Sequence, residues 1–114
     1  MITISMMDAN SFVESAVLDK TAYKLRFNWN DDAQHWSMDI CTDKNVDIAC
    51  GLSVVPNFPL LNQYKRISSL PRGELMAVVT DGGDDIGRKD FVSGRAVLVY
   101  MSEEELKNAL ESTV

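Results

Sequence analysis

The sequence predicts an all-β fold, a single small β-barrel or β-sandwich of about seven strands with a short C-terminal helix. The 114 residues are 46% apolar, which suits one compact domain spanning 1–114. Apolar and polar side chains alternate along several segments, the period-two pattern of strands with one buried face. Clusters of Asp, Asn and Gly separate these segments, and too few helical stretches are present for alternating βαβ units.

Residues 22–29 give the clearest strand signal. Four large apolar side chains alternate there with polar ones: Tyr23, Leu25, Phe27 and Trp29. The turn-forming sequence 30–33 then precedes a second alternation around Trp36 and Ile40, which predicts a β-hairpin. Another turn, 42–45, leads to a third strand. Its shared face is expected to carry Val46, Ile48, Cys50 and Leu52. A meander is the simplest topology for these strands.

Four further strands are expected outside this region. Residues 2–5 and 11–18 alternate or are rich in β-branched side chains. Residues 74–80 and 95–100 are short, strongly apolar runs, which fit buried strands better than helices. A Ser-x-x-Glu capping box begins at Ser102 and is followed by acidic residues, so a short helix should start there.

Two long connections interrupt the strand pattern. Segment 56–72 contains three prolines, which lack a backbone donor, so we expect a packed loop with one helical turn near 60–64. Segment 81–90, with the sequence DGGDDIGRKD, combines three glycines with four aspartates. This composition predicts an exposed, mobile loop between two strands.

Composition opposes several classes of function. The formal charge of −6 disfavours a surface that binds nucleic acid phosphates. No apolar run approaches the roughly 20 residues that span a bilayer, and the N-terminus lacks leader features, so we expect folding in a cytoplasm. The cysteines, Cys41 and Cys50, are expected to be reduced and to fill the core, and their spacing fits no zinc site.

No residue pattern predicts catalysis. His35 is the only histidine, and without a nucleophile motif it is interpreted as an ordinary strand or turn residue. The adjacent carboxylates Asp31 and Asp32 should diverge on a turn, unlike the flanking acids of a glycosidase. We therefore expect no enzyme activity and no cofactor.

Two binding alternatives deserve weight. The four aspartates of segment 81–90 could gather around calcium, but their spacing departs from known loops, and a solvated acidic loop is the preferred interpretation. The aromatic set around Tyr23 and Trp36 could stack on bases, as in a single-stranded nucleic-acid-binding small β-barrel. Core packing is preferred, because Lys24 and Arg26 fall on the opposite face of the strand. No metal site is assigned.

Several segments, taken in order, resemble the baseplate plug family of contractile-tailed phages, first described in a cyanophage. They are LRFNW (25–29), HWSMDI (35–40), GLSVVPNFPLL (51–61) with Tyr64, LPRGEL (70–75) and the Asp-Gly pair at 81–82. The specificity lies in their order and spacing across the chain. The acidic tail from 102 to 114 does not map onto the family pattern.

The resemblance implies a non-enzymatic virion component at the junction of tail tube and baseplate hub, which plugs or organises the tube end. It implies contacts with other phage tail proteins, such as hub, tail tube, tape measure or sheath-associated baseplate components, with several copies around the tail axis and no specific nucleic acid or membrane. The expected contact residues lie in the two loops: Asn57, Phe58, Leu60, Leu61, Tyr64, Asp81, Asp84 and Asp85. The three apolar members Phe58, Leu60 and Leu61 could equally seal one end of the core.

Overall fold

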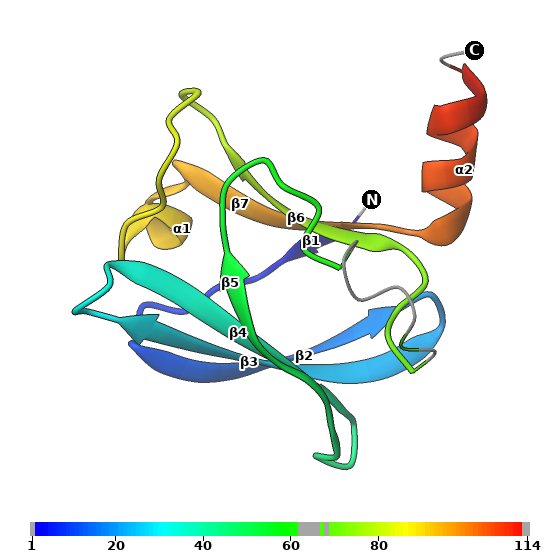
Figure 1. The fold of residues 1–114 in the computed structure, drawn as a ribbon, viewed down its shortest axis with the longest axis horizontal. Coiled ribbons are helices and arrows are strands. Elements are labelled where there is room, and N and C mark those ends of the chain that lie inside the picture. The colour runs from blue at the N-terminus through cyan, green and yellow to red at the C-terminus, as the bar shows by residue number, and fades with distance from the viewer. Residues whose placement is uncertain (1, 62–66, 68, 113–114) are drawn as a thin grey trace.

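Seven strands form two antiparallel sheets that face each other in a computed structural model, which describes residues 2–61, 67 and 69–112 (Figure 1). The four-stranded sheet has the order β2 (Ser11–Leu18), β3 (Thr21–Asn30), β4 (His35–Thr42) and β5 (Asp47–Val54). The three-stranded sheet has the order β1 (Ile2–Ile4), β7 (Ala96–Met101) and β6 (Glu74–Val79). Helix α1 (Asp90–Ser93) precedes β7, and helix α2 (Glu103–Ser112) follows it. The all-β prediction is confirmed as a sandwich, and the described strands do not close into a barrel.

The meander prediction is confirmed for the four-stranded sheet, in which each strand pairs with the next along the chain. Asp19 and Lys20 connect β2 to β3 with φ angles of 51° and 69°. Two consecutive residues with positive φ match the twist of the flanking strands, which explains the tightness of this hairpin. The alternation of β3 holds, because Leu25 and Phe27 are fully buried.

Strand β5 departs from its expected alternation through a β-bulge. Cys50 and Gly51 together stand opposite the single residue Asp39 of β4. Gly51 has a φ of 73°, which glycine adopts without steric cost, and its N–H donates to the Asp39 carboxylate at 2.8 Å. Leu52 faces the core as expected, but on the other side of the extra residue Ala49 faces inward in place of Cys50.

The bulge corrects one prediction about the cysteines. Both are free thiols, and Cys41 is buried as expected. Cys50 is exposed, so its predicted place in the core is wrong. Val46, expected on the same face, is 61% exposed. A single inserted residue moves side chains to the opposite face because the strand period is two.

The core lies between the two sheets, and the β5–β6 connection closes one side of it. Pro56 forms a parallel bridge with Ala77, and the Leu60 N–H donates to the Leu75 carbonyl at 2.9 Å. Leu61 is fully buried, and its N–H donates to the Glu74 carboxylate at 2.5 Å. Residues 62–64 of the expected helical turn near 60–64 lie outside the described residues.

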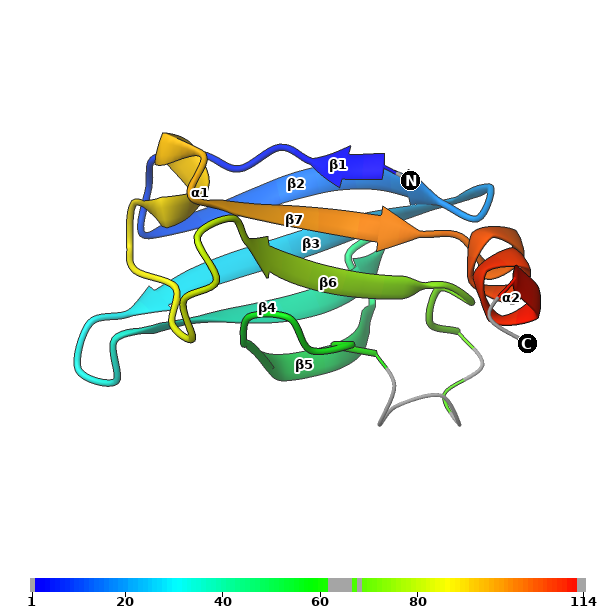
Figure 2. The same cartoon turned by 90° about the horizontal axis from the view of Figure 1, so that it is seen from above.

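Helix α2 begins with the predicted capping box. The Glu105 N–H donates to the Ser102 hydroxyl at 3.1 Å, and the Ser102 N–H donates to the Glu105 carboxylate at 3.1 Å. The helix stands away from both sheets rather than packing on them (Figures 1 and 2). In the part of the chain that the structure describes, no helix has the length and apolar character needed to cross a bilayer.

Candidate functional site

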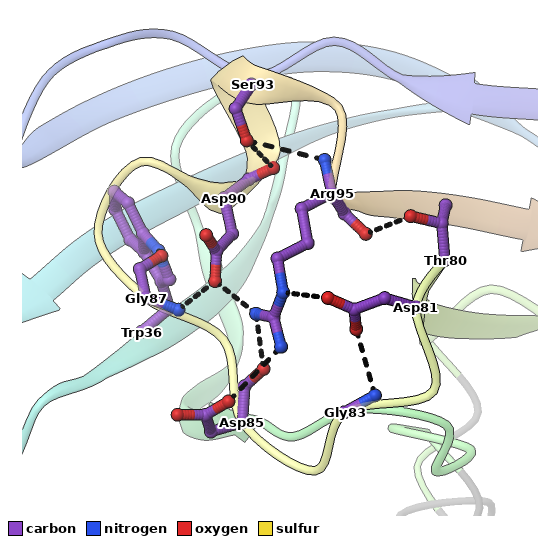
Figure 3. A network of polar contacts seen from close by, with 9 residues as sticks. All are labelled: Trp36, Thr80, Asp81, Gly83, Asp85, Gly87, Asp90, Ser93 and Arg95. Carbon is purple, nitrogen blue, oxygen red and sulfur yellow. Dashed lines mark hydrogen bonds and ion pairs between the residues drawn. The ribbon is translucent and has the colours of Figure 1, made fainter.

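The loop between β6 and β7 is organised around the guanidinium group of Arg95 (Figure 3). Its Nε donates to the Asp81 carboxylate at 2.7 Å and one terminal nitrogen donates to Asp90 at 2.5 Å. The same terminal nitrogen donates to the Asp85 backbone carbonyl at 3.1 Å, and the other lies 3.4 Å from the Asp85 carboxylate. One cation therefore gathers three aspartates that are spread over ten residues of chain.

Strand pairing places the backbone of Arg95 at the base of this loop, from where its side chain reaches the aspartates. The Thr80 N–H and hydroxyl both donate to the Arg95 carbonyl, at 2.8 and 3.0 Å, which closes the base of the loop. Gly83 leaves room for the guanidinium, because a Cβ at that position would lie 2.3 Å from an Arg95 nitrogen. The Gly83 N–H also donates to Asp81 at 3.0 Å. Any larger residue at 83 would have to displace the cation.

In this loop one cation, Arg95, is shared by three carboxylates, so the cluster remains net acidic. The hydrogen bond from Arg95 lowers the pKa of Asp81, and the Gly83 N–H adds to this effect. Asp81 and Asp90 in turn raise the pKa of Arg95, so the cation stays charged. Three of the four aspartates named in the calcium alternative gather, but they gather around Arg95, and the described residues contain no group of three or more acidic, His or Cys side chains placed to hold a metal ion.

The same loop is tied to the aromatic end of the core. The Gly87 N–H donates to Asp90 at 2.6 Å, and the Gly87 carbonyl accepts the Trp36 indole N–H at 3.4 Å (Figure 3). Arg88 lies over the Trp36 ring at 5.9 Å and forms an ion pair with Asp8 at 2.9 Å. Segment 81–90 is exposed at Asp81, Asp84 and Asp85, as expected, while its second half is attached to the sandwich through Gly87 and Arg88. It ends in α1, a helical turn that the sequence did not predict.

The aromatic side chains pack with one another inside the protein. Trp36 is 1% exposed, and its ring contacts Phe12 and Trp29 edge to face. Lys24 and Arg26 lie on the other face of β3, as the alternation predicts. Lys24 and Arg26 therefore do not share a surface with these rings. Arg88 does lie over Trp36, but that ring is 1% exposed and offers no open face on which a base could stack.

The proline-containing loop divides its predicted contact residues between surface and core. Asn57 is exposed with a φ of 56°, and Phe58 is 46% exposed. Leu60 and Leu61 are buried, so they seal the core, one of the two roles left open by the sequence. Tyr64 lies outside the described residues. In the acidic loop, Asp81, Asp84 and Asp85 are all exposed.

The sequence predicted the place of His35 correctly but did not identify Arg95 as a site residue. His35 is half-buried at the start of β4, opposite Asn30, in the strand position expected of it. Sequence reasoning missed Arg95 altogether. One signal was available in the sequence: four aspartates are followed by a basic residue, Arg95, directly before an apolar strand. Pairing of the two strands brings such a residue back to the start of the loop, next to the aspartates.

Comparison with known families places the geometry in context. Residues 1–104 match the model of a family described as cyanophage baseplate Pam3 plug gp18. No curated protein matches the chain. The matched range contains both sheets and both candidate loops, and it ends at the start of α2, where the sequence resemblance also stopped.

Proposed function

The chain belongs to the cyanophage baseplate plug family, and from this premise we propose that it sits where the tail tube meets the baseplate hub and closes or organises the tube end. The family gives the chain a structural role in a phage baseplate. The match over residues 1–104 carries the proposal. The tube-end position and the identity of the neighbours, such as hub, tail tube, tape measure or sheath-associated proteins, are the proposed part.

The Arg95-centred loop supports a role in protein contacts. Arg95 and Asp90 are largely covered, whereas the Asp85 side chain is 83% exposed and Asp84 is exposed beside it. A loop whose backbone is already held by ion pairs loses little conformational freedom when a partner binds. The proposed contact residues are therefore Asp84 and Asp85, with Asn57 and Phe58 from the neighbouring loop. Exposed carboxylates at an interface contribute mainly to partner choice and association rate.

The proposed function is contact with other proteins of the same virion, and it includes no catalysis. Several copies around the tail axis would present these loops repeatedly. The proposal places the protein in the virion baseplate after folding in the host cytoplasm, and it assigns no cofactor and no specific nucleic acid.

The proposal is tested by purifying assembled tails and locating the chain in a reconstruction. We expect density for the sandwich at the junction of tube and hub. A chain absent from purified particles, or bound far from that junction, would contradict the proposal.

The loop contact is tested with a matched pair of charge reversals. Asp84→Lys changes the acidic loop, and Asp43→Lys makes the same change in the exposed β4–β5 turn. We expect Asp84→Lys to reduce the amount of chain in purified tails and Asp43→Lys to leave it near the wild-type amount. Equal losses would mean that overall charge, not the loop, determines incorporation.

A further inference from the structure

The outer face of β6 and β7 in the three-stranded sheet is largely apolar, although it faces away from the core, and the exposed Thr3 of β1 borders it. An antiparallel sheet with one face in water normally alternates apolar and polar residues. Strands β6 and β7 instead carry apolar side chains at nearly every position. The exposed or half-buried outward set consists of Met76, Val78, Val97, Val99 and Met101. Val78 is 36% exposed and the others are half-buried, so these side chains form a surface rather than a core. Glu74 has the same place in the alternation, opposite Met101, but its side chain is buried and its carboxylate accepts the Leu61 N–H.

These side chains are contiguous. Val78 pairs with Val97, and Met76 pairs with Val99, so they are direct cross-strand neighbours on one face. Val55, which is 40% exposed, lies next to this strip because the following residue bridges β6. We call the five outward residues of β6 and β7 the outer apolar strip. Single exposed apolar residues are common, but contiguous ones on a sheet indicate an interaction site.

The other sheet shows what a solvated outer face looks like in this protein. There the outward residues include Lys24, Arg26 and Asp39. Arg26 lies 3.4 Å from the Asp39 carboxylate and 2.6 Å from that of Asp47. Val13 and Val17 of β2 are exposed on the same face, but Ser15 separates them and Val13 stands opposite Arg26, so polar and charged side chains interrupt the apolar ones. The outer apolar strip is therefore not a general property of the chain.

No described element covers the outer apolar strip. Figure 2 looks onto this face, and β1, β7 and β6 lie open across the middle of the view. Helix α2 rises at one end of the strip, and the loop 81–85 rises at the other, both away from the four-stranded sheet (Figure 1). A helix of ten residues is marginal in water by itself, and α2 does not lie on either sheet (Figure 1).

Charge at the two ends indicates what can bind there. Exposed Asp84 and Asp85 stand at one end, and Glu103 and Glu104 stand exposed at the start of α2 at the other. Exposed Lys107 follows one turn along the helix, whose first turn carries three acidic residues. A second copy laid face to face would bring acidic ends against acidic ends in either orientation, which opposes association. The complementary surface is apolar in its centre and bordered by Lys and Arg.

From these observations we infer that the outer apolar strip is the binding face for another tail protein, one that presents an apolar surface rimmed by basic residues. This inference rests on the proposed function and adds the surface and the chemistry of the partner. The centre supplies apolar burial, and the acidic ends select the partner and set its register.

The test measures binding of the purified chain to the purified hub and tail tube proteins of the same phage tail by titration calorimetry. Val78→Asp places a charge in the strip, and Val17→Asp makes the same change at a valine that is 61% exposed on β2. We expect Val78→Asp to weaken binding by about tenfold or more and Val17→Asp to change it by less than about twofold. Val78→Ser serves as a milder second variant, and thermal melts show that each variant is folded.

The basic rim is tested through salt dependence. Glu103→Gln with Glu104→Gln removes two charges beside the strip, and Asp32→Asn with Asp43→Asn removes two from exposed turns elsewhere. We expect only the first pair to weaken binding at low salt and to flatten its dependence on ionic strength. Equal effects of the two pairs would overturn the assignment of a basic rim.

The outcomes separate this inference from the proposed function. Binding to a tail protein that is insensitive to Val78→Asp overturns the outer apolar strip as the binding face but leaves the baseplate role intact. Absence of the chain from assembled tails overturns both. A dimer of the isolated chain in light scattering that Val78→Asp converts to a monomer would show a second copy on this face and overturn the basic partner.

Discussion

Replacing Tyr100 with Phe removes one hydroxyl from a fully buried point that connects the two sheets. This hydroxyl donates to the Asp19 carboxylate in the β2–β3 turn and accepts the Gly73 N–H at 2.8 Å. Asp19 also accepts the Glu103 N–H at 3.3 Å, so the same cluster positions the start of α2. Phe keeps the ring and its packing, and the substitution therefore isolates the polar contacts.

The expected cost follows from the two hydrogen bonds. A bond to a charged group contributes about 1.5–3 kcal/mol and a neutral one about 0.5–1.5 kcal/mol. Asp19 is half-buried, so the lower part of the first range applies, and the loss should total about 2–3 kcal/mol. For a domain of this size 1 kcal/mol lowers Tm by about 4 °C, which predicts a decrease of roughly 8–12 °C.

Urea unfolding followed by tryptophan fluorescence measures this loss. Tyr23→Phe is the matched control, because its hydroxyl donates to a neutral acceptor, the Ser69 carbonyl, at 3.1 Å. We expect it to lower the free energy of unfolding by about 0.5–1 kcal/mol. Equal losses of unfolding free energy for the two variants would show that the hydrogen bond to charged Asp19 stabilises the fold no more than a neutral one.

The dependence on pH gives an independent check. Burial, and next the hydrogen bond to Asp19, raise the pKa of Tyr100 above the ordinary value of 10.0. The folded protein therefore holds this proton more tightly than the unfolded chain. Its stabilising effect is complete below pH 10 and declines as the pH rises above it. The wild-type free energy of unfolding should fall more steeply above pH 10 than that of Tyr100→Phe, and identical alkaline slopes would refute the reasoning.

Other parts of the structure make further predictions. Leu61→Ala should lower the free energy of unfolding by about 2–5 kcal/mol, whereas Phe58→Ala should cost less than about 1 kcal/mol, as urea unfolding can show. A thiol reagent should modify Cys50 in the folded protein and Cys41 only after unfolding, although the pKa of both thiols is raised, by burial at Cys41 and by partial desolvation and the nearby Asp47 at Cys50; equal rates would contradict the outward position that the bulge gives Cys50. Arg95→Met should accelerate amide hydrogen exchange across 81–90 without changing that of β4, and unchanged exchange would mean that the ion cluster does not hold the loop.

Local sequence patterns were sufficient to predict an element wherever a single physical rule determined its structure. The alternation in 22–29 predicted β3 because each apolar side chain there needs a buried face, and the capping box predicted α2 because Ser102 and Glu105 satisfy each other's backbone donors. The order of motifs predicted the family, which the match over residues 1–104 confirms.

The candidate site was predictable in composition but not in arrangement. The sequence identified an acidic loop, yet the position of Arg95 within it depends on the pairing of β6 with β7. The apolar runs 74–80 and 95–100 predicted strands, but they could not show that one face of the sheet lacks a cover. That face is exposed because no described element packs over it (Figure 2).

By itself the sequence determined the strands, the turns, the terminal helix and the family, because period-two alternation, capping and motif order are local properties of the chain. Only the tertiary structure decided that Cys50 faces outward, that Arg95 sits among the aspartates, and that the outer apolar strip is open. These features depend on register and on contacts between residues far apart in sequence. A one-residue bulge or a missing cover changes them without altering any local pattern.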